Sequence, residues 1–331
     1  MRDETEAPTP PVPEAIIEPA SWSSRAPDAE WAPAPLVEAL GERFITMAAA
    51  EPCTIDRQVD GWAVLGASVR GKSHGHRGEH RDDAIACVSR DGLLVMAVAD
   101  GAGSSALSRI GAAVVADIAT HRTAARFAAD GHNADTTSRL GTAMAHAVHD
   151  AAMRLHALAA AAAEPPTAFR TTLLLVAMVG DTMLVSQVGD GAVLVQQADG
   201  RVLRVGGARD TMWAGEVTCF VPDPCAMTAA AEFRQLRTSD VALVALLTDG
   251  IDDPFHPLEQ SGDRLVSQWR HGTTESIGVA RQPPAGAVLG DAAALLTWMG
   301  FEQRGESDDR SLLLAWRDVA VTPPVTPPVT K

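Results

Sequence analysis

The chain has 331 residues, of which 46% are hydrophobic and 21% are charged, and its formal net charge is −15. This composition is typical of a soluble globular protein that folds as one large domain or two small ones. The excess of acidic residues argues against nucleic acid and anionic membranes as partners, because little basic surface is available to neutralise phosphates.

Both ends of the chain are predicted to lie outside the folded domain. Residues 1–55 are rich in Pro, Ala and Glu, which favours a partly disordered extension with a short helix within 36–48. Trp22 and Trp31 are unusual for a linker and are candidates for contact with the domain or with a partner. Residues 319–331 form a flexible, proline-rich tail. Without a signal-peptide segment or an apolar run of roughly 18–20 residues, we expect a cytoplasmic protein with no membrane span.

Residues 56–318 are predicted to form the folded domain. In chain order, the apolar patterns predict helices at 105–129, 137–163 and 287–299, and strands at 62–69, 84–89, 93–99, 171–179, 183–188, 192–197, 201–205, 241–247 and 312–316. A basic, glycine-rich loop is expected at 70–81, and a loop or flap with one or two short strands at 206–240. Consecutive strands with short turns and two adjacent helices favour an α+β fold with antiparallel sheets over a doubly wound sheet.

The cysteines show no pattern of a metal or redox site. Cys53, Cys87, Cys219 and Cys225 form no CxxC pair. Neither a disulfide framework nor a zinc ribbon is expected with this chain length and spacing. We therefore predict reduced thiols, with Cys87 buried on a strand.

Carboxylates recur at the ends of predicted strands. Seven Asp-Gly dipeptides begin at Asp60, Asp91, Asp100, Asp130, Asp190, Asp199 and Asp249. Asp-Gly is first of all a turn signal, and Asp91 and Asp199 fit hairpin turns. Asp100 and Asp249 differ, because each ends a long apolar strand and no strand follows at hairpin distance. A functional carboxylate is the better interpretation of these two residues.

Acidic pairs also stand before two predicted strands, at Asp82-Asp83 and Asp308-Asp309. Each pair alone can arise by chance, but converging carboxylates repel one another unless cations neutralise them. Two Mg²⁺ or Mn²⁺ ions suit such an oxygen-rich site and can activate a bridging water for attack on phosphorus. The basic loop at 70–81 would then hold the phosphate, which the planar Arg guanidinium fits well.

Seven motifs occur in the order found in one known family. They are GxSxRGxxH at 66–74, DDA at 82–84, VADGAGS at 98–104, TTLL at 171–174, VGDG at 188–191, LLTDG at 246–250 and DDRSL at 308–312. Over about 62–317 the chain resembles the metal-dependent Ser/Thr protein phosphatases of the PP2C (PPM) type, and most of all their bacterial group. The resemblance implies a PP2C-like αββα sandwich, in which helices flank two antiparallel β-sheets and a binuclear metal site lies at one edge.

The resemblance also implies the ligands of the first metal. Asp100 matches the ligand that bridges both metals, and the carbonyl of Gly101 matches a contact to one of them. Asp249 and Asp308 match the other ligands of the first metal. Asp100 and Asp249 are accordingly the residues on which catalysis is expected to depend most.

The remaining carboxylates match weaker or more variable positions. Asp83 matches the aspartate that serves the second metal directly or through water. Asp82 occupies the preceding position, which is a ligand in some members. Asp190 matches an aspartate that helps to bind a third, weaker metal in bacterial members, and a simple hairpin turn is the alternative for it.

The sequence departs from the family pattern near the expected proton donor. Ala102 stands where animal members carry a His that is thought to act as general acid, and many bacterial members also lack this His. The leaving group would then be protonated by water or by a nearby group such as His74 or His76. A zinc site at His74, His76 and His80 is an alternative, although its spacing matches no zinc pattern.

The phosphate-binding arginine is also displaced from its usual position. Gly78 stands at the family's spacing, which leaves Arg70 and Arg77 as the candidates. The expected activity is hydrolysis of phosphoserine and phosphothreonine by direct attack of water, on a phosphorylated protein and with room for a cognate Ser/Thr kinase system. The alternatives are a pseudophosphatase that binds a phosphoprotein or partner, and a phosphatase for a small metabolite.

Overall fold

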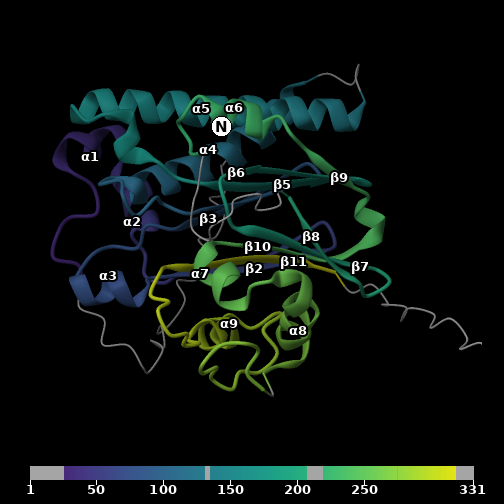
Figure 1. Ribbon diagram of the computed structural model, residues 1–331. Helices are drawn as coiled ribbons and strands as arrows, with labels where there is room; N and C mark the ends of the chain where they lie inside the picture. Colours follow the sequence, from purple (N-terminus) through teal and green to yellow (C-terminus); the bar gives the residue numbers. More distant parts are fainter. Residues whose placement is uncertain (1–25, 131–134, 207–218, 274, 318–331) are drawn as a thin grey trace, which may run out of the picture.

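The strands of this protein form two sheets, with antiparallel pairing between neighbouring strands. The computed structural model describes residues 26–130, 135–206, 219–273 and 275–317 (Figure 1). In spatial order, the first sheet consists of β1 (Cys53–Val59), β2 (Trp62–Val69), β11 (Arg310–Trp316), β10 (Val241–Leu247), β7 (Ala192–Gln197) and β8 (Val202–Val205). The second consists of β3 (Ala84–Arg90), β4 (Leu93–Ala99), β5 (Leu173–Val179), β6 (Thr182–Val188) and β9 (Arg234–Leu236).

Helices cover the outer face of each sheet (Figure 1). The second sheet packs against α4 (Ser108–Ala129) and α5 (Thr136–Ala162), and the first against α8 (Leu258–His271) and α9 (Ala292–Met299). The shorter helices are α1 (Ala34–Leu40), α2 (Glu42–Ala48), α3 (Lys72–Arg77), α6 (Cys225–Ala230), α7 (Asp249–Asp252), η1 (Pro166–Phe169), η2 (Thr238–Asp240) and η3 (Asp253–Phe255). These layers form an αββα sandwich, so the predicted α+β fold is confirmed. Over the described ranges, no helix has the length and apolarity needed to cross a membrane.

Strand β4 shows how the apolar sequence builds two cores at once. All seven of its residues are buried, and alternate side chains point to opposite faces of the sheet. Val95 and Ala97 pack against the helices, whereas Met96 and Val98 pack between the sheets. A continuous apolar run of strand length is therefore what a strand covered on both faces requires.

The apolar strands were predictable, and the mixed or short elements were not. Four predicted strands have the observed bounds, namely β2, β4, β7 and β10. The structure adds β1, places the short strand β9 within the expected flap at 206–240, and forms α3 from part of the expected loop at 70–81. The expected helix at 36–48 is two helices, because Gly41 breaks it with a φ of 83°. Helix α9 begins at Ala292 rather than at residue 287. Its N-cap is Asp291, whose side chain accepts a hydrogen bond from the amide of Ala294.

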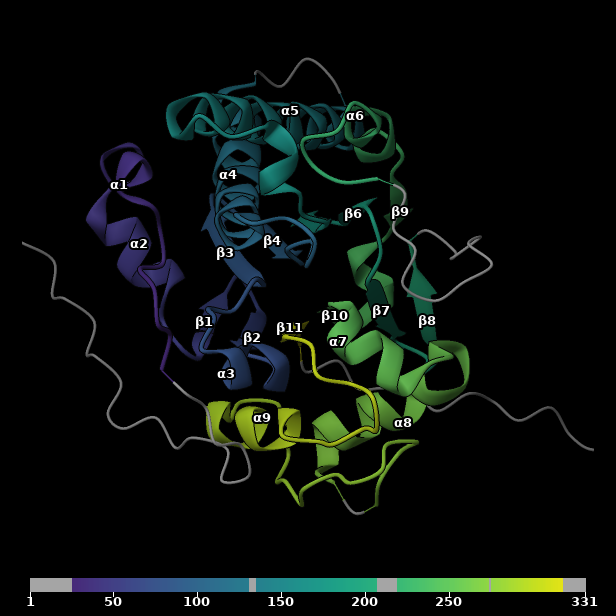
Figure 2. The ribbon, with the colours of Figure 1, turned by 60° about the vertical axis from the view of Figure 1, so that its left-hand side comes forward.

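Several expectations fall on residues that the structure does not describe. These are Trp22, the tail at 319–331 and the part of the expected flap at 207–218. The described remainder of that flap contains α6 and β9. Figure 2 shows α1 and α2 beside α4 and β3, so the described part of the predicted extension lies against the domain.

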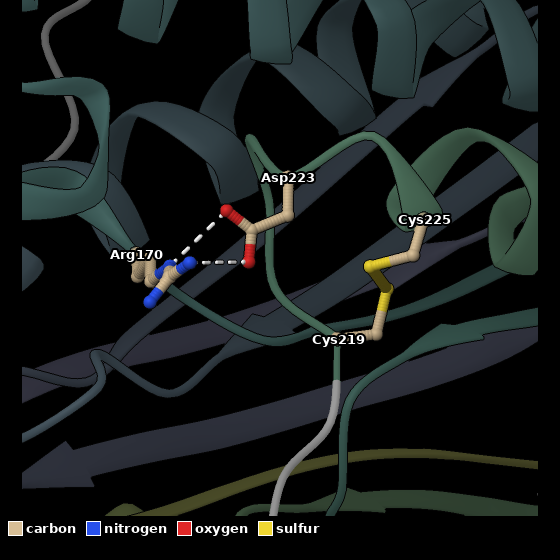
Figure 3. Close-up of a disulfide and its surroundings, with 4 residues drawn as sticks. All are labelled: Arg170, Cys219, Asp223 and Cys225. Atoms are coloured by element: carbon tan, nitrogen blue, oxygen red, sulfur yellow. Dashed lines mark hydrogen bonds and ion pairs between the residues drawn. A yellow bond between two sulfur atoms is a disulfide. The ribbon is translucent and has the colours of Figure 1, made fainter.

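The prediction of four reduced cysteines was wrong for two of them. Cys219 and Cys225 form a disulfide with their Cα atoms 5.9 Å apart (Figure 3). A turn between them, which contains Pro222 and Pro224, brings the two Cβ atoms within bonding range although no CxxC motif is present. Cys53 and Cys87 are free, and Cys87 is buried on β3 as predicted.

Candidate active site

Four of the six predicted carboxylates line one cavity of about 620 Å³. They reach it because β4 ends directly before Asp100, only Thr248 separates β10 from Asp249, and only Asp309 separates Asp308 from β11. The predicted site residues that line the cavity are His74, Arg77, Asp100, Gly101, Asp190, Asp249 and Asp308. Asp83 lies buried next to this set and Asp82 is half-buried, whereas Arg70 lines a different cavity. The fold therefore brings together residues that are far apart in the sequence.

Asp100 is held in place through its backbone by two threonines. Its carbonyl oxygen accepts hydrogen bonds from the Thr171 hydroxyl at 2.7 Å and from the Thr172 amide at 2.8 Å. Its amide donates to the Thr172 hydroxyl at 3.1 Å. These bonds fix the backbone of Asp100, while its carboxylate lies beside that of Asp249, with which it shares a side-chain hydrogen bond.

Asp83 is held through its carboxylate by two hydroxyl groups. One carboxylate oxygen accepts from Thr248 at 2.9 Å and from Ser311 at 2.8 Å. Thr248 precedes α7 and Ser311 is the second residue of β11, so this buried aspartate connects three segments of the site. The Thr and Ser of the LLTDG and DDRSL motifs thus have a structural role that their position in the sequence did not indicate.

The structure reveals a role for Asp309 that the sequence did not indicate. Its side chain is 1% exposed and accepts hydrogen bonds from the Gly71 amide at 2.6 Å, the His74 Nδ1 at 2.9 Å and the Asp82 amide at 2.6 Å. The pairing of Asp308 with Asp309 in the sequence was the only available signal. Asp309 is a positioning residue, which fixes His74 and Asp82 relative to β11.

Glycines allow the segments of the site to approach one another closely. A Cβ atom on Gly250 would lie 1.9 Å from the carbonyl oxygen of Asp309, and a Cβ on Gly71 would lie 2.3 Å from the carbonyl carbon of Asp308. A Cβ on Gly101 would lie 2.7 Å from the carbonyl oxygen of Asp82. These Asp-Gly and Arg-Gly dipeptides are therefore packing requirements, beyond their value as turn signals.

The cavity disfavours the ionised form of its acids. Burial, reinforced by Asp308 and Asp190, raises the pKa of Asp249 to about 8. Burial and the charge of Asp249 also raise the pKa of Asp100, while burial and the charge of Asp309 raise that of Asp83. Like charges in a desolvated cavity repel one another, so this set of acids favours the arrival of a cation.

The donor atoms fit a hard divalent cation. They are carboxylate oxygens and the Gly101 carbonyl, which suit Mg²⁺ or Mn²⁺ better than zinc. Among the residues that the structure describes, no three or more His, Cys, Asp or Glu side chains are already arranged with the geometry of a metal site. The zinc alternative gains no support, because His74 is bonded to Asp309 and the Nε2 of His80 donates to the carbonyl of Ala29 at 2.8 Å.

The structure separates the two arginine candidates. Arg77 lines the cavity, where its Nε donates to Glu79 at 2.5 Å and a guanidinium nitrogen bonds to the hydroxyl of Ser73. Arg70 points elsewhere, because its guanidinium donates to the carbonyl of Glu79 at 3.0 Å and lines the second cavity. Arg77 is therefore the better placed of the two for contact with an anion in the main cavity.

Comparisons with known proteins identify the family of this chain. Residues 70–283 match the family described as Protein phosphatase 2C. The chain belongs to this family. Within the Protein phosphatase 2C match lie Asp83, Asp100, Asp190 and Asp249, whereas Asp308 lies beyond residue 283 and joins them only through the fold.

Solved structures of Protein phosphatase 2C-like fold cover most of the chain. A bacterial serine phosphatase is 14% identical, with a TM-score of 0.52 over 80% of this chain and 99% of that one. The serine/threonine phosphatase Stp1 from Staphylococcus aureus is 14% identical, with a TM-score of 0.53 over 80% and 97%. The S. agalactiae serine/threonine phosphatase is 11% identical, with a TM-score of 0.52 over 78% and 100%. The search of curated proteins gives no match.

Proposed function

We propose that this protein is a metal-dependent protein phosphatase that hydrolyses phosphoserine and phosphothreonine. The observation that carries the proposal is the cavity in which Asp100, Asp249 and Asp308 face the same space as Arg77 and His74. Membership of the Protein phosphatase 2C family supports a phosphatase, and the acidic cavity supports the use of cations. The expected partner is a phosphorylated protein in the cytoplasm, with a cognate Ser/Thr kinase system as its source.

The residues present fit two Mg²⁺ or Mn²⁺ ions, with Asp190 available for a third. The proposed ligands of the two ions are Asp82, Asp83, Asp100, the carbonyl of Gly101, Asp249 and Asp308. When bound, such ions supply a water of lowered pKa as the nucleophile. The chain's own contribution is to hold the acids at fixed positions, through the threonines that bind the backbone of Asp100 and the hydroxyls that bind Asp83.

Arg77 and His74 would act on the phosphate and on the leaving group. The Arg77 guanidinium offers paired N–H donors to phosphate oxygens. Burial alone would lower the pKa of His74, but the hydrogen bond and charge of Asp309 outweigh it and raise this pKa to about 9. His74 would therefore be protonated at neutral pH and able to donate a proton to the departing serine or threonine oxygen.

The proposal is tested by turnover of p-nitrophenyl phosphate and of a phosphothreonine peptide with Mn²⁺, with Mg²⁺ and with EDTA. We expect metal-dependent hydrolysis that Asp100→Asn or Asp249→Asn lowers by about 100-fold or more, because each variant removes a charged ligand oxygen. Asp91→Asn is the matched control, since Asp91 begins an Asp-Gly turn between β3 and β4 and its substitution should leave turnover unchanged.

Full activity of Asp100→Asn would contradict the proposal. A folded protein that turns over neither substrate with any metal would favour the phosphoprotein-binding alternative.

A further inference from the structure

The loop from Cys219 to Cys225 forms part of the wall of the candidate active site. Phe220 lines the main cavity and is half-buried. Among the described residues that line this cavity, Phe220 is the one large apolar side chain, since the others are charged, polar or small. An apolar ring at this position contributes nothing to binding a phosphate group, so it calls for another role.

Three attachments hold this loop in place. The backbones of Val221 and Thr171 exchange two hydrogen bonds of 2.9 and 3.1 Å. Asp223 accepts from Arg170, with both of its carboxylate oxygens 3.1 Å from guanidinium nitrogens (Figure 3). The disulfide between Cys219 and Cys225 closes the loop around Phe220. Figure 3 shows the ion pair and the disulfide on the same turn of the chain.

The segment that holds the loop also holds the reacting centre. The Thr171 hydroxyl donates to the carbonyl of Asp100, and the Arg170 carbonyl accepts from the amide of Ala102 at 3.0 Å. The Arg170 guanidinium carbon lies 5.8 Å from the centre of the Phe220 ring. Phe220 is therefore fixed relative to Asp100 through one short segment, 170–172.

We infer that Phe220 is a specificity-determining residue, which contacts an apolar side chain next to the phosphorylated residue of a protein substrate. The inference rests on the proposed phosphatase function, because the phosphate must occupy the cavity beside Asp100. A phosphopeptide extends beyond this cavity, and an apolar neighbour that covers the exposed part of the Phe220 ring removes apolar surface from water. A small substrate without such a neighbour makes no use of the ring.

The disulfide gives this wall a second property. Cys225 is exposed and Cys219 is half-buried, so a dithiol can reach the bond, whereas Cys87 is buried. In the exchange, the protein S–S bond breaks and each sulfur gains one electron and one proton, while the dithiol is oxidised to its own disulfide. Reduction removes one of the three attachments and should loosen the position of Phe220.

The first test compares three substrates with Phe220→Ala. We expect kcat/KM to fall about tenfold for a phosphothreonine peptide with a neighbouring Leu, and to stay within about twofold for the same peptide with Gly and for p-nitrophenyl phosphate. Phe233→Ala is the matched control, because this partly buried Phe does not line the cavity. Equal losses on all three substrates would overturn the inference, since they would show a merely structural role.

The second test examines the disulfide. Treatment of the wild-type protein with a dithiol should lower the preference for Leu over Gly by at least about threefold, and the Cys219→Ser/Cys225→Ser variant should show this lower preference without treatment. Cys53→Ser is the control for a free thiol. An unchanged peptide preference after reduction would overturn the role of the disulfide.

The outcomes distinguish the inference from the proposed function. If the wild-type protein turns over no substrate, the phosphatase proposal fails, and the peptide preference is then measured by calorimetry as binding to the wild-type protein and to Phe220→Ala. Tighter binding of the Leu peptide that Phe220→Ala abolishes would support the role of Phe220 even then. Equal binding of both peptides would overturn it.

Discussion

The carboxyl groups of Asp82 and Asp249 in the candidate site are hard to ionise in the folded chain. Burial raises the pKa of Asp82 to about 6, and burial with nearby carboxylates raises that of Asp249 to about 8. In the unfolded chain both groups ionise near their ordinary value of 3.8. Between these values the folded chain binds more protons than the unfolded chain, so the free energy of unfolding falls as the pH rises.

We expect the Tm of the EDTA-treated protein to fall between about pH 5 and pH 8. His74 acts in the same direction, because its raised pKa of about 9 means that its stabilising contribution is lost as the pH rises toward that value. Added Mn²⁺ should restore Tm most strongly near the upper end of this range, because the proposed metal site would bind the ion through ionised carboxylates of the folded state. Melting curves followed by circular dichroism measure both effects, and Asp249→Asn should flatten the pH dependence. A Tm that rises over this range in EDTA would contradict the electrostatic description of the site.

At the scale of elements, the contact between α7 and β11 determines how close the acids come. Gly250→Ala should lower the free energy of unfolding by about 2 kcal/mol, because the added Cβ would meet the carbonyl oxygen of Asp309 and force the segments apart. Gly286→Ala is the matched control, since nothing lies within 4 Å of its added Cβ. Urea unfolding of the two variants measures the difference. Equal stabilities would show that the two segments can separate without cost.

The elements that could be predicted from the sequence are those that are buried along their whole length. The strands β4 and β10 are buried along their whole length, so a continuous apolar run predicts them. Strand β1 is mostly exposed and reads CTIDRQV, without a regular alternation that would predict it. Helix α3 contains Gly75 and is held by distant contacts, such as the bond from the Ser73 amide to the carbonyl of Ser307 at 3.0 Å.

The same distinction applies to the site. The convergence of Asp100, Asp249 and Asp308 on one cavity was predictable, because the first two follow a strand, the third precedes one, and strand ends meet at a sheet edge. The role of Asp309 was not predictable, because its three hydrogen-bond donors come from residues more than 200 positions earlier. The Cys219–Cys225 disulfide was missed for a related reason, since a turn rather than a motif brings the sulfurs together.

At the scale of the whole molecule, residues 26–32, which precede the region matched to the family, form hydrogen bonds with segments next to the site. The amide of Asp28 donates to the carbonyl of Gly78 at 2.9 Å, and His80 donates to the carbonyl of Ala29. The carbonyl of Trp31 accepts from Arg109 on α4 at 2.7 Å. These bonds attach residues 26–32 to α4 and to the segment that leads into Asp82, although the Protein phosphatase 2C match starts only at residue 70.

The Trp31 side chain holds residues 26–32 against the domain, so its removal should weaken both the fold and the site. The side chain is 5% exposed and packs edge-on against Phe44, with ring centres 6.3 Å apart. We expect Trp31→Ala to lower the free energy of unfolding by about 3 kcal/mol, because it leaves a large cavity next to Phe44. Met47→Ala is the control from the neighbouring helix α2, where the side chain is 63% exposed and its loss should cost less than about 0.5 kcal/mol. Urea unfolding tests the stability, and Mn²⁺ titration of the proposed phosphatase activity tests the site. If Trp31→Ala binds Mn²⁺ as tightly as Met47→Ala, residues 26–32 support only the fold. If the metal affinity falls together with the stability, residues 26–32 help to position Asp82.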